Sequence, residues 1–144
     1  MPMHWRGAAA DAIVRRRVAR LIDIASRWLR DCIRIKMSRW QPTRGKGERM
    51  RGLFPSEPGE YPKKVRGVAR MNVGAEFNKE LLEARIGTRA SFKLGRWLEL
   101  GTHKMKPRPW LSNGIRDFWD GVKAILHGKA VPAMPKVEGD ESQE

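Results

Sequence analysis

The sequence predicts an α+β fold, in which a long N-terminal amphipathic helix and a C-terminal helix pack with a small antiparallel β-sheet. Three observations predict it: a helical apolar repeat before residue 40, alternating apolar and polar side chains after residue 70, and a second helical repeat after residue 110. The 144 residues, 40% of them hydrophobic, are enough for one modest core. We therefore expect one domain over residues 1–129, with three parts. These are the N-terminal helix (8–40), an extended linker or arm (41–64), and the sheet with the C-terminal helix (65–129).

The N-terminal helix is predicted by a segment without Gly or Pro over residues 8–39. Its apolar side chains recur in alternating steps of four and three residues, which places them on one helix face. They are Val14, Val18, Leu21, Ala25, Trp28, Cys32 and Ile35. Five arginines project from the opposite side: Arg16, Arg20, Arg27, Arg30 and Arg34. A single arginine there is an ordinary solvated residue, but the set of five favours a surface that faces DNA or an acidic partner.

The linker is rich in Gly, Pro and charged residues, and it contains a turn signal at Pro58-Gly59. A loop this long in so small a domain is mobile or functional. We expect it to act as an arm that becomes ordered on a neighbouring subunit.

The sheet is predicted by alternation over residues 71–77 and 81–87, with a turn at Asn78 and Lys79 between them. We expect these two segments to form a β-hairpin. A further short strand is expected over residues 96–100, ending at Gly101.

The second helix is predicted over residues 112–126, where apolar side chains again recur at helical spacing. Pro109 suits its first turn, and Gly128 is a natural stop. After it, residues 130–144 combine two prolines with four acidic side chains and few apolar ones. This composition predicts a disordered acidic tail.

The charge of the chain points to a polyanionic partner. The 30 Lys and Arg against 16 Asp and Glu give a formal net charge of +14. The excess is uneven, with net charges of +9, +7 and −2 over residues 1–50, 51–110 and 111–144. No apolar run approaches the roughly 20 residues that cross a bilayer, so no membrane partner is expected.

Catalytic chemistry has little support in the sequence, and we expect no enzyme, no metal site and no cofactor. The only cysteine, Cys32, lies within the apolar stripe of a helix, and the three histidines are not closely spaced. Glu99 is the one carboxylate that stands out, because the basic loop with Lys104, Lys106 and Arg108 follows it. We expect Glu99 to form an ion pair with this loop rather than to act as a general base.

Several motifs carry a resemblance to a known family. Residues 97–111 read WLELGTHKMKPRPWL, in which Glu-Leu-Gly-Thr is followed by Lys-Met and then by Arg-Pro-Trp-Leu at the start of a helix. Upstream, residues 56–62 read SEPGEYP, residues 67–70 read GVAR and residues 86–88 read IGT. In this order, the motifs resemble those of the small tail-completion or head-tail connector proteins of long-tailed phages and prophages, of the minor tail protein Z type. His103 stands where that family has Ser, and Trp110 where it has Phe.

The resemblance implies a structural virion protein of the phage neck without a cofactor. Its copies would form a homo-oligomeric ring that links a head-completion or connector protein to the tail terminator or tail tube protein. The ring would surround genomic DNA and contact it without sequence preference, at the head-tail junction of the virion after assembly in the host cytoplasm. Subunit or partner contacts are then expected at Lys104, Met105, Lys106, Arg108 and Trp110. Structural roles are expected for Pro58, Gly59, Gly67, Arg70, Glu99, Gly101, Thr102 and Pro109.

Two other functions remain open from the residues alone. The charge and the six Trp also suit a free, sequence-independent nucleic-acid-binding protein, although no helix-turn-helix or aromatic RNA-binding motif is recognisable. A small hydrolase or nuclease would need a catalytic set of residues, which the sequence does not offer.

Overall fold

The computed structural model describes residues 7–38, 58–62, 68–89 and 92–136. Its elements in chain order are helix α1 (Gly7–Lys36), helix α2 (Val68–Asn72), strand β1 (Val73–Asn78), strand β2 (Glu83–Thr88), helix α3 (Lys93–Leu100) and helix α4 (Leu111–Leu126). The predicted α+β class is confirmed. No helix in these ranges is long and apolar enough to cross a membrane. Most of the expected arm, residues 41–57 and 63–64, lies outside the described part.

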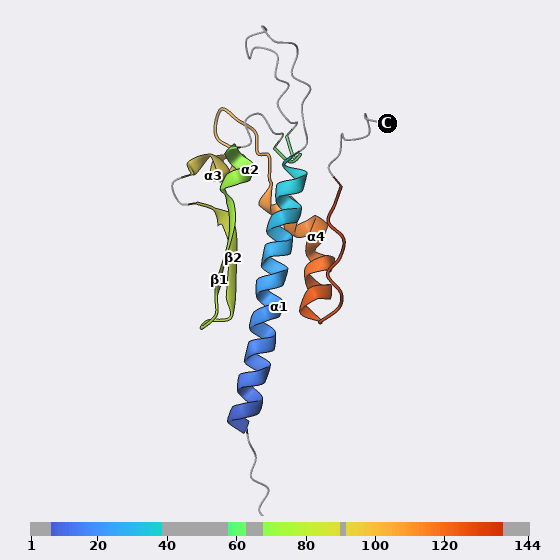
Figure 1. Ribbon diagram of the computed structural model, residues 1–144. Helices are drawn as coiled ribbons and strands as arrows, with labels where there is room; N and C mark the ends of the chain where they lie inside the picture. The colour runs from blue at the N-terminus through green and yellow to red at the C-terminus, as the bar shows by residue number, and fades with distance from the viewer. Residues whose placement is uncertain (1–6, 39–57, 63–67, 90–91, 137–144) are drawn as a thin grey trace, which may run out of the picture.

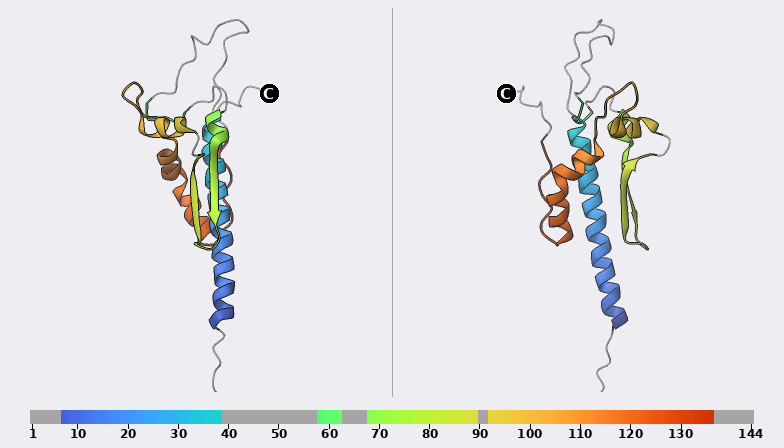
Figure 2. Two further views of the ribbon diagram at one scale, coloured as in Figure 1. Left: turned by 90° about the vertical axis from the view of Figure 1, so that its left-hand side faces the viewer. Right: turned by 180° about the vertical axis from the view of Figure 1, so that it is seen from behind.

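Helix α1 is the axis of the molecule, with the β-hairpin on one side and α4 on the other (Figure 1). Its C-terminal half supplies much of the core, which includes the fully buried Cys32 and Ile33. Val73 of β1 and Ile125 of α4 join the same cluster from the two flanking elements. Its N-terminal part extends beyond both the hairpin and α4 (Figure 2). The predicted N-terminal helix is therefore confirmed, but it ends at Lys36 rather than at residue 40, and residues 39–40 lie outside the described part. Only part of the helix has a partner within the chain.

Two glycines let α4 approach α1 closely. A Cβ atom added at Gly114 would overlap the side chain of Ile33, and one at Gly121 would overlap the Trp28 ring. Trp28 also meets Phe118 edge to face, with ring centroids 6.0 Å apart. Large side chains of α1 thus fill the space that glycine leaves on α4, which is how a core reaches high packing density.

The predicted hairpin is confirmed, shifted by about two residues toward the C-terminus. Strands β1 and β2 pair antiparallel, in a register that runs from Val73 opposite Thr88 to Asn78 opposite Glu83. The side-chain oxygen of Asn78 accepts hydrogen bonds from the N–H groups of Glu80 (2.9 Å) and Leu81 (3.1 Å). This Asx-type turn explains why the strand ends at Asn78.

The third strand predicted over residues 96–100 is wrong, because this segment belongs to helix α3. Leu94, Trp97 and Leu98 are spaced by three and four residues, which is a helical pattern. Five residues are too few for alternation to distinguish the two cases. The helix also buries Leu98 in the core.

The ends of α4 are set by local hydrogen bonding. The helix begins at Leu111 with Trp110 as N-cap, so Pro109 lies before the first turn rather than in it. Gly128 has a φ of +74°, its N–H donates to Ile125 O, and Lys129 N–H donates to Ala124 O. This is a Schellman motif, and it confirms the predicted stop at Gly128.

The expectation of a disordered tail from residue 130 onward is wrong for its first residues, because residues 130–136 pack on α1. Trp28 Nε1 donates a hydrogen bond to Pro132 O over 3.0 Å. The Sγ of Cys32 lies 3.7 Å from the Sδ of Met134. A buried indole N–H needs an acceptor, and the backbone carbonyl of Pro132 supplies it. Residues 137–144 lie outside the described part.

Candidate nucleic-acid and partner interface

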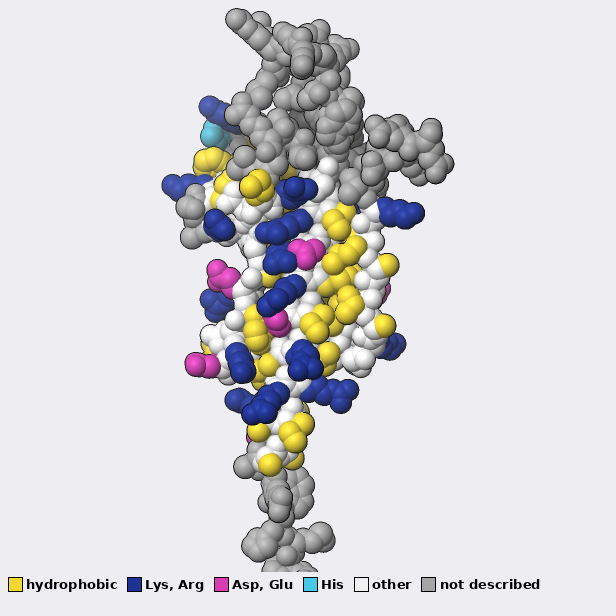
Figure 3. Space-filling model, viewed as in Figure 1, with side chains coloured by type: hydrophobic (Ala, Val, Ile, Leu, Met, Phe, Trp, Pro, Cys, Tyr) yellow, Lys and Arg dark blue, Asp and Glu magenta, His cyan; other side chains and the backbone are white. Residues whose placement is uncertain are grey.

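The basic face of α1 is the most extended charged surface of the described residues. At 100° per residue, the five arginines predicted to share a face fall within an arc of roughly 80°. Arg16, Arg20 and Arg27 are exposed, whereas Arg30 and Arg34 are half-buried. Figure 3 shows Lys and Arg side chains in a column along α1, interrupted by two acidic side chains. The structure therefore brings these five residues together as the helical spacing predicts.

Two of the five arginines pair with acidic neighbours on the same helix. Arg27 Nε lies 2.9 Å from Asp23 Oδ1, and Arg30 Nε lies 2.7 Å from Asp31 Oδ1. The Arg27 side chain is 65% exposed, and an ion pair this exposed contributes little to stability, whereas the Arg30–Asp31 pair is half-buried. Both pairs hold the guanidinium groups in place and leave the column positive.

Two arginines and Asp31 are among the residues that line a hollow where the C-terminal end of α1 meets α2. The hollow measures about 380 Å³ and is lined in part by Arg34, Ser38 and Arg70. Arg34 Nε donates to Val73 O over 3.0 Å, and Arg70 Nη1 donates to Ser38 Oγ over 2.7 Å. These bonds fix two guanidinium groups beside each other at the edge of the hollow.

The pKa of Arg34 shows the electrostatic character of this cluster. Partial burial lowers it first, and the positive charges of Arg30, Arg70 and Arg89 lower it further, while Asp31 opposes them. Arginine stays charged at any physiological pH, so these residues repel one another. An anionic oxygen, such as that of a phosphate, would relieve this repulsion and accept hydrogen bonds from the guanidinium groups.

The loop over residues 101–110 contains the residues that were predicted to contact a partner, and some of them are exposed. Lys104 and Lys106 are exposed, and Arg108 is half-buried. The loop is held in shape by a tight turn, in which Thr102 N–H donates to Met105 O over 2.8 Å. Gly101 has a φ of +73°, and a Cβ there would lie 2.9 Å from Met105 O. Only glycine fits this position without strain, which agrees with the structural role expected for it.

The prediction that Trp110 contacts a partner is wrong, because its side chain is only 3% exposed. Its Nε1 donates to Gly95 O over 2.9 Å, inside the core. Met105 is half-buried and packs against the same core. The Trp was expected at the surface because it follows a basic, proline-rich loop, but an aromatic residue with a satisfied N–H is well suited to burial. Lys104 and Lys106 are the exposed members of this set, whereas Met105 and Arg108 are both half-buried.

Glu99 has a different role from the expected ion pair with the basic loop. Its carboxylate accepts hydrogen bonds from the N–H groups of Trp110 (2.8 Å), Leu111 (2.9 Å) and Ser112 (3.0 Å), and from the Ser112 hydroxyl. These N–H groups begin α4 and have no acceptor within the helix. A carboxylate there also interacts favourably with the helix dipole. Glu99 thus fixes α3 to the start of α4, which is a structural role.

The turn at Pro58-Gly59 lies against the same part of the fold. Gly59 N–H donates to Pro107 O over 3.1 Å, and Asn113 Nδ2 donates to Gly59 O over 2.8 Å. Tyr61 donates its hydroxyl proton to Asp117 over 2.9 Å, and burial together with this carboxylate raises the pKa of Tyr61. The turn, the basic loop and the start of α4 therefore form one hydrogen-bonded unit, which we call the loop node (residues 58–61, 99–113 and 117). Gly67 lies outside the described residues.

The described residues hold no group of three or more His, Cys, Asp or Glu side chains that could bind a metal ion. Cys32 is fully buried, and burial raises the pKa of its thiol to about 11. A buried thiol with a raised pKa is a poor nucleophile.

Sequence reasoning missed an apolar groove on α4. It treated the apolar residues of this helix as a single core face, whereas Ile115, Trp119 and Leu126 are each more than 40% exposed. The signal was present in the sequence, because these three positions lie on a different face from the buried Ile125.

Comparisons with models of protein families, with curated proteins and with solved structures found no match to this chain.

Proposed function

We propose that this chain is a structural protein of the neck of a long-tailed phage, which completes the tail and joins it to the head. In this proposal, copies form a homo-oligomeric ring between a head-completion or connector protein and the tail terminator or tail tube protein. The ring surrounds the genomic DNA at the head-tail junction of the virion, after assembly in the host cytoplasm.

The loop node is the observation that carries this proposal. The two longest motifs behind the family resemblance, residues 56–62 and 97–111, are far apart in the sequence, yet Gly59 N–H donates to Pro107 O. Gly59 O also accepts a hydrogen bond from Asn113, which lies just after the second motif. Glu99, Gly101 and Thr102 all have structural contacts there. In a structural protein, the residues of a family motif are expected to hold the fold together by contacts with one another. The contacts in the loop node are of this kind, and they support the resemblance.

The basic column of α1 supports the DNA-facing part of the proposal. Phosphates carry the same charge whatever the base, so arginines along one helix face bind DNA of any sequence. Dispersed contacts of this kind are suited to DNA that must pass through a ring. The arginine cluster around Arg34 and Arg70 adds a place where one phosphate would be bound by several donors.

The alternative is a free, sequence-independent nucleic-acid-binding protein, and the same arginine cluster favours it. The two functions differ in self-association. A neck protein assembles with copies of itself or with connector and terminator rings, and its DNA affinity is weak and steeply salt-dependent. A free binding protein needs no assembly to bind.

The test combines sedimentation velocity with DNA titrations of the purified full chain. The variant R16Q/R20Q removes two charges from the column, and R116Q/K129Q removes two exposed charges elsewhere as a matched control. With the proposed function, the chain self-associates, and R16Q/R20Q reduces the slope of log affinity against log salt by up to about 1.8. The control leaves the slope within experimental error.

Two results would overturn the proposal. One is a stable monomer that binds a single DNA sequence tightly at physiological salt. The other is a gene that lies outside the interval between head-completion and major tail genes.

A further inference from the structure

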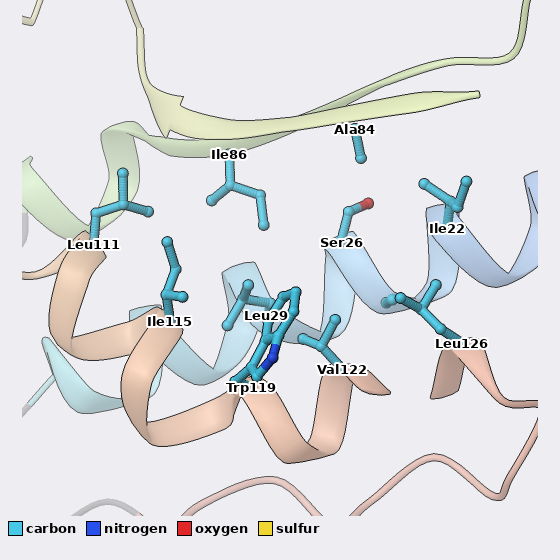
Figure 4. A pocket seen from close by; sticks show the side chains of 11 residues that line it. Ile22, Ser26, Leu29, Ala84, Ile86, Leu111, Ile115, Trp119, Val122 and Leu126 are labelled. Atoms are coloured by element: carbon cyan, nitrogen blue, oxygen red, sulfur yellow. The ribbon is translucent and has the colours of Figure 1, made fainter. Parts of the chain in front are cut away.

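An open apolar groove runs between the β-hairpin and α4, with α1 at its base (Figure 4). It measures about 340 Å³. Three elements contribute its side chains: Ile22 and Leu29 from α1, Ile86 from β2, and Ile115, Trp119 and Leu126 from α4. Trp119 is 49% exposed, so the groove leaves a large aromatic surface in contact with water. Exposed apolar surface of this kind marks an interaction site.

The lining of the groove is largely apolar. Its polar groups are the Ser26 hydroxyl, which donates to Asp23 O over 2.9 Å, and the indole N–H of Trp119. Small-molecule sites normally offer a few convergent polar groups that orient the ligand. The lining of this groove therefore favours an apolar surface as its occupant.

The chain itself displays such a surface at the other end of α1. Ile13 and Val14 are 67% and 57% exposed, although they continue the apolar repeat that is buried farther along the helix. Val14, Val18 and Ile22 are spaced by four residues, so the exposed stripe runs directly into the base of the groove. The first turns of α1 project beyond the hairpin and α4 (Figure 2), and no described segment covers them.

We infer that the projecting segment of α1 (residues 7–18) of one copy docks in the groove of a second copy. Its 12 residues span roughly 18 Å, and the 16 residues of α4 that flank the groove span roughly 24 Å, so the lengths are compatible. An amphipathic helix that places its apolar face in an apolar groove is a common mode of recognition.

The segment cannot reach the groove of its own chain. Helices α1 and α4 run antiparallel, with Ile33 beside Gly114 and Arg17 beside Gly128. Val14 therefore lies beyond the far end of the groove, on a straight helix that leads away from it. The contact must be between copies.

Each copy then offers one projecting segment and one groove. In the proposed ring the segment of each copy enters the groove of the next copy, which makes the contact heterologous. Repeated contacts of this type close into a ring or continue as a filament. The inference deepens the proposed function and rests on it, because it names the surfaces that would join copies in the ring. With few large apolar residues on the segment, a single contact is weak, and ring closure strengthens the assembly by linking several contacts.

The first experiment measures self-association of the full chain by sedimentation velocity over a range of concentrations. V14E places a charge on the exposed stripe, and A12E places the same charge on the opposite face of the same exposed turn. We expect V14E to weaken self-association at least tenfold and A12E to change it less than twofold. Equal behaviour of V14E and the unchanged chain would overturn the inference.

The second experiment identifies the docking partner by cross-linking with a short bismaleimide. Cross-links are expected when V14C is mixed with I115C or L126C, and not within any single variant. The unchanged chain is the control, because Cys32 is fully buried. Cross-linking of V14C with itself would overturn the inference in favour of paired α1 helices.

These results separate the inference from the proposed function. If the unchanged chain remains monomeric at every concentration and with DNA present, both are overturned. If it self-associates but V14C cross-links to neither groove position, the inference alone is overturned and the ring must use another surface.

Discussion

The two halves of α1 have the same apolar repeat but opposite surroundings. In the C-terminal half, Trp28, Cys32 and Ile33 are at most 5% exposed, between the hairpin and α4. In the N-terminal half, Ile13 and Val14 are more than half exposed. A repeat in the sequence therefore indicates that a helix has an apolar face, but not whether the covering surface belongs to the same chain.

The largest expected difference between the halves is in stability. W28A removes a buried ring that packs on Gly121 and Phe118, and should lower the free energy of unfolding by about 3–5 kcal/mol. V14A removes an exposed side chain and should change it by less than about 0.5 kcal/mol when the chain is monomeric. Urea unfolding of both variants at low protein concentration measures this. Similar costs for the two would mean that the halves are packed alike.

A cysteine in the N-terminal half of α1 should react with a thiol reagent about a hundredfold faster, or more, than Cys32 in the C-terminal half. Cys32 is buried with its pKa raised to about 11, whereas a cysteine introduced by A12C would be exposed with an ordinary pKa of about 8.5. Thiolate is the reactive form, so the A12C reaction should level off above about pH 9. The Cys32 reaction should still rise between pH 9 and 10. The measurement is the rate at which each thiol reacts with a chromogenic disulfide, in native buffer and in urea. Equal rates at positions 12 and 32 in native buffer would contradict the prediction.

Exchanges between glycine and alanine should also have different effects on stability where α4 packs on α1 and in the projecting half of α1. G114A should destabilise the chain by about 1–3 kcal/mol, because its Cβ would overlap the Ile33 side chain. Alanine is the better helix former by about 1 kcal/mol, so propensity alone predicts the opposite sign. In the projecting half, A12G should cost about 1 kcal/mol, from propensity alone. Thermal or urea unfolding would show which effect dominates at residue 114.

The smallest expected effect concerns the charged face, which spans the boundary between the halves. D23N removes the partner of Arg27 in an exposed pair and should cost about 0.3–0.5 kcal/mol, decreasing with added salt. The same change increases the net positive charge of the column, so it should strengthen DNA binding at low salt. Weaker DNA binding by D23N would show that Asp23 positions Arg27 for that contact.

The sequence was sufficient to predict elements with strong periodicity. Both long helices and the hairpin follow from spacing, and the Gly128 stop follows from the left-handed conformation that glycine adopts. Residues 96–100 were misassigned because a short apolar segment fits both a strand and a helix. In the structure, this segment forms a helix that places Leu98 in the core.

Only the part of the candidate interface that lies on a single helix, α1, could be predicted from the sequence. The arginine column follows from helical spacing alone, whereas its continuation to Arg70 depends on how α2 meets the end of α1. The burial of Trp110 depends on Gly95, which lies fifteen residues away in the chain. The packing of Pro132 and Met134 on α1 also could not be predicted, because a contact made by one backbone carbonyl and one thioether leaves no periodic pattern in the sequence.

The continuity of α1 has a mechanical consequence. No glycine or proline interrupts it between residues 8 and 36, so it has no hinge between its free end and Arg34. Helix α1 is therefore stiff, and it packs against the hairpin and α4 along its C-terminal half only. A tilt imposed on its free N-terminal end would be transmitted to the guanidinium groups at the packed end. In the ring that we propose, a load on the free end of one subunit would therefore move the arginines with which that subunit is proposed to contact DNA.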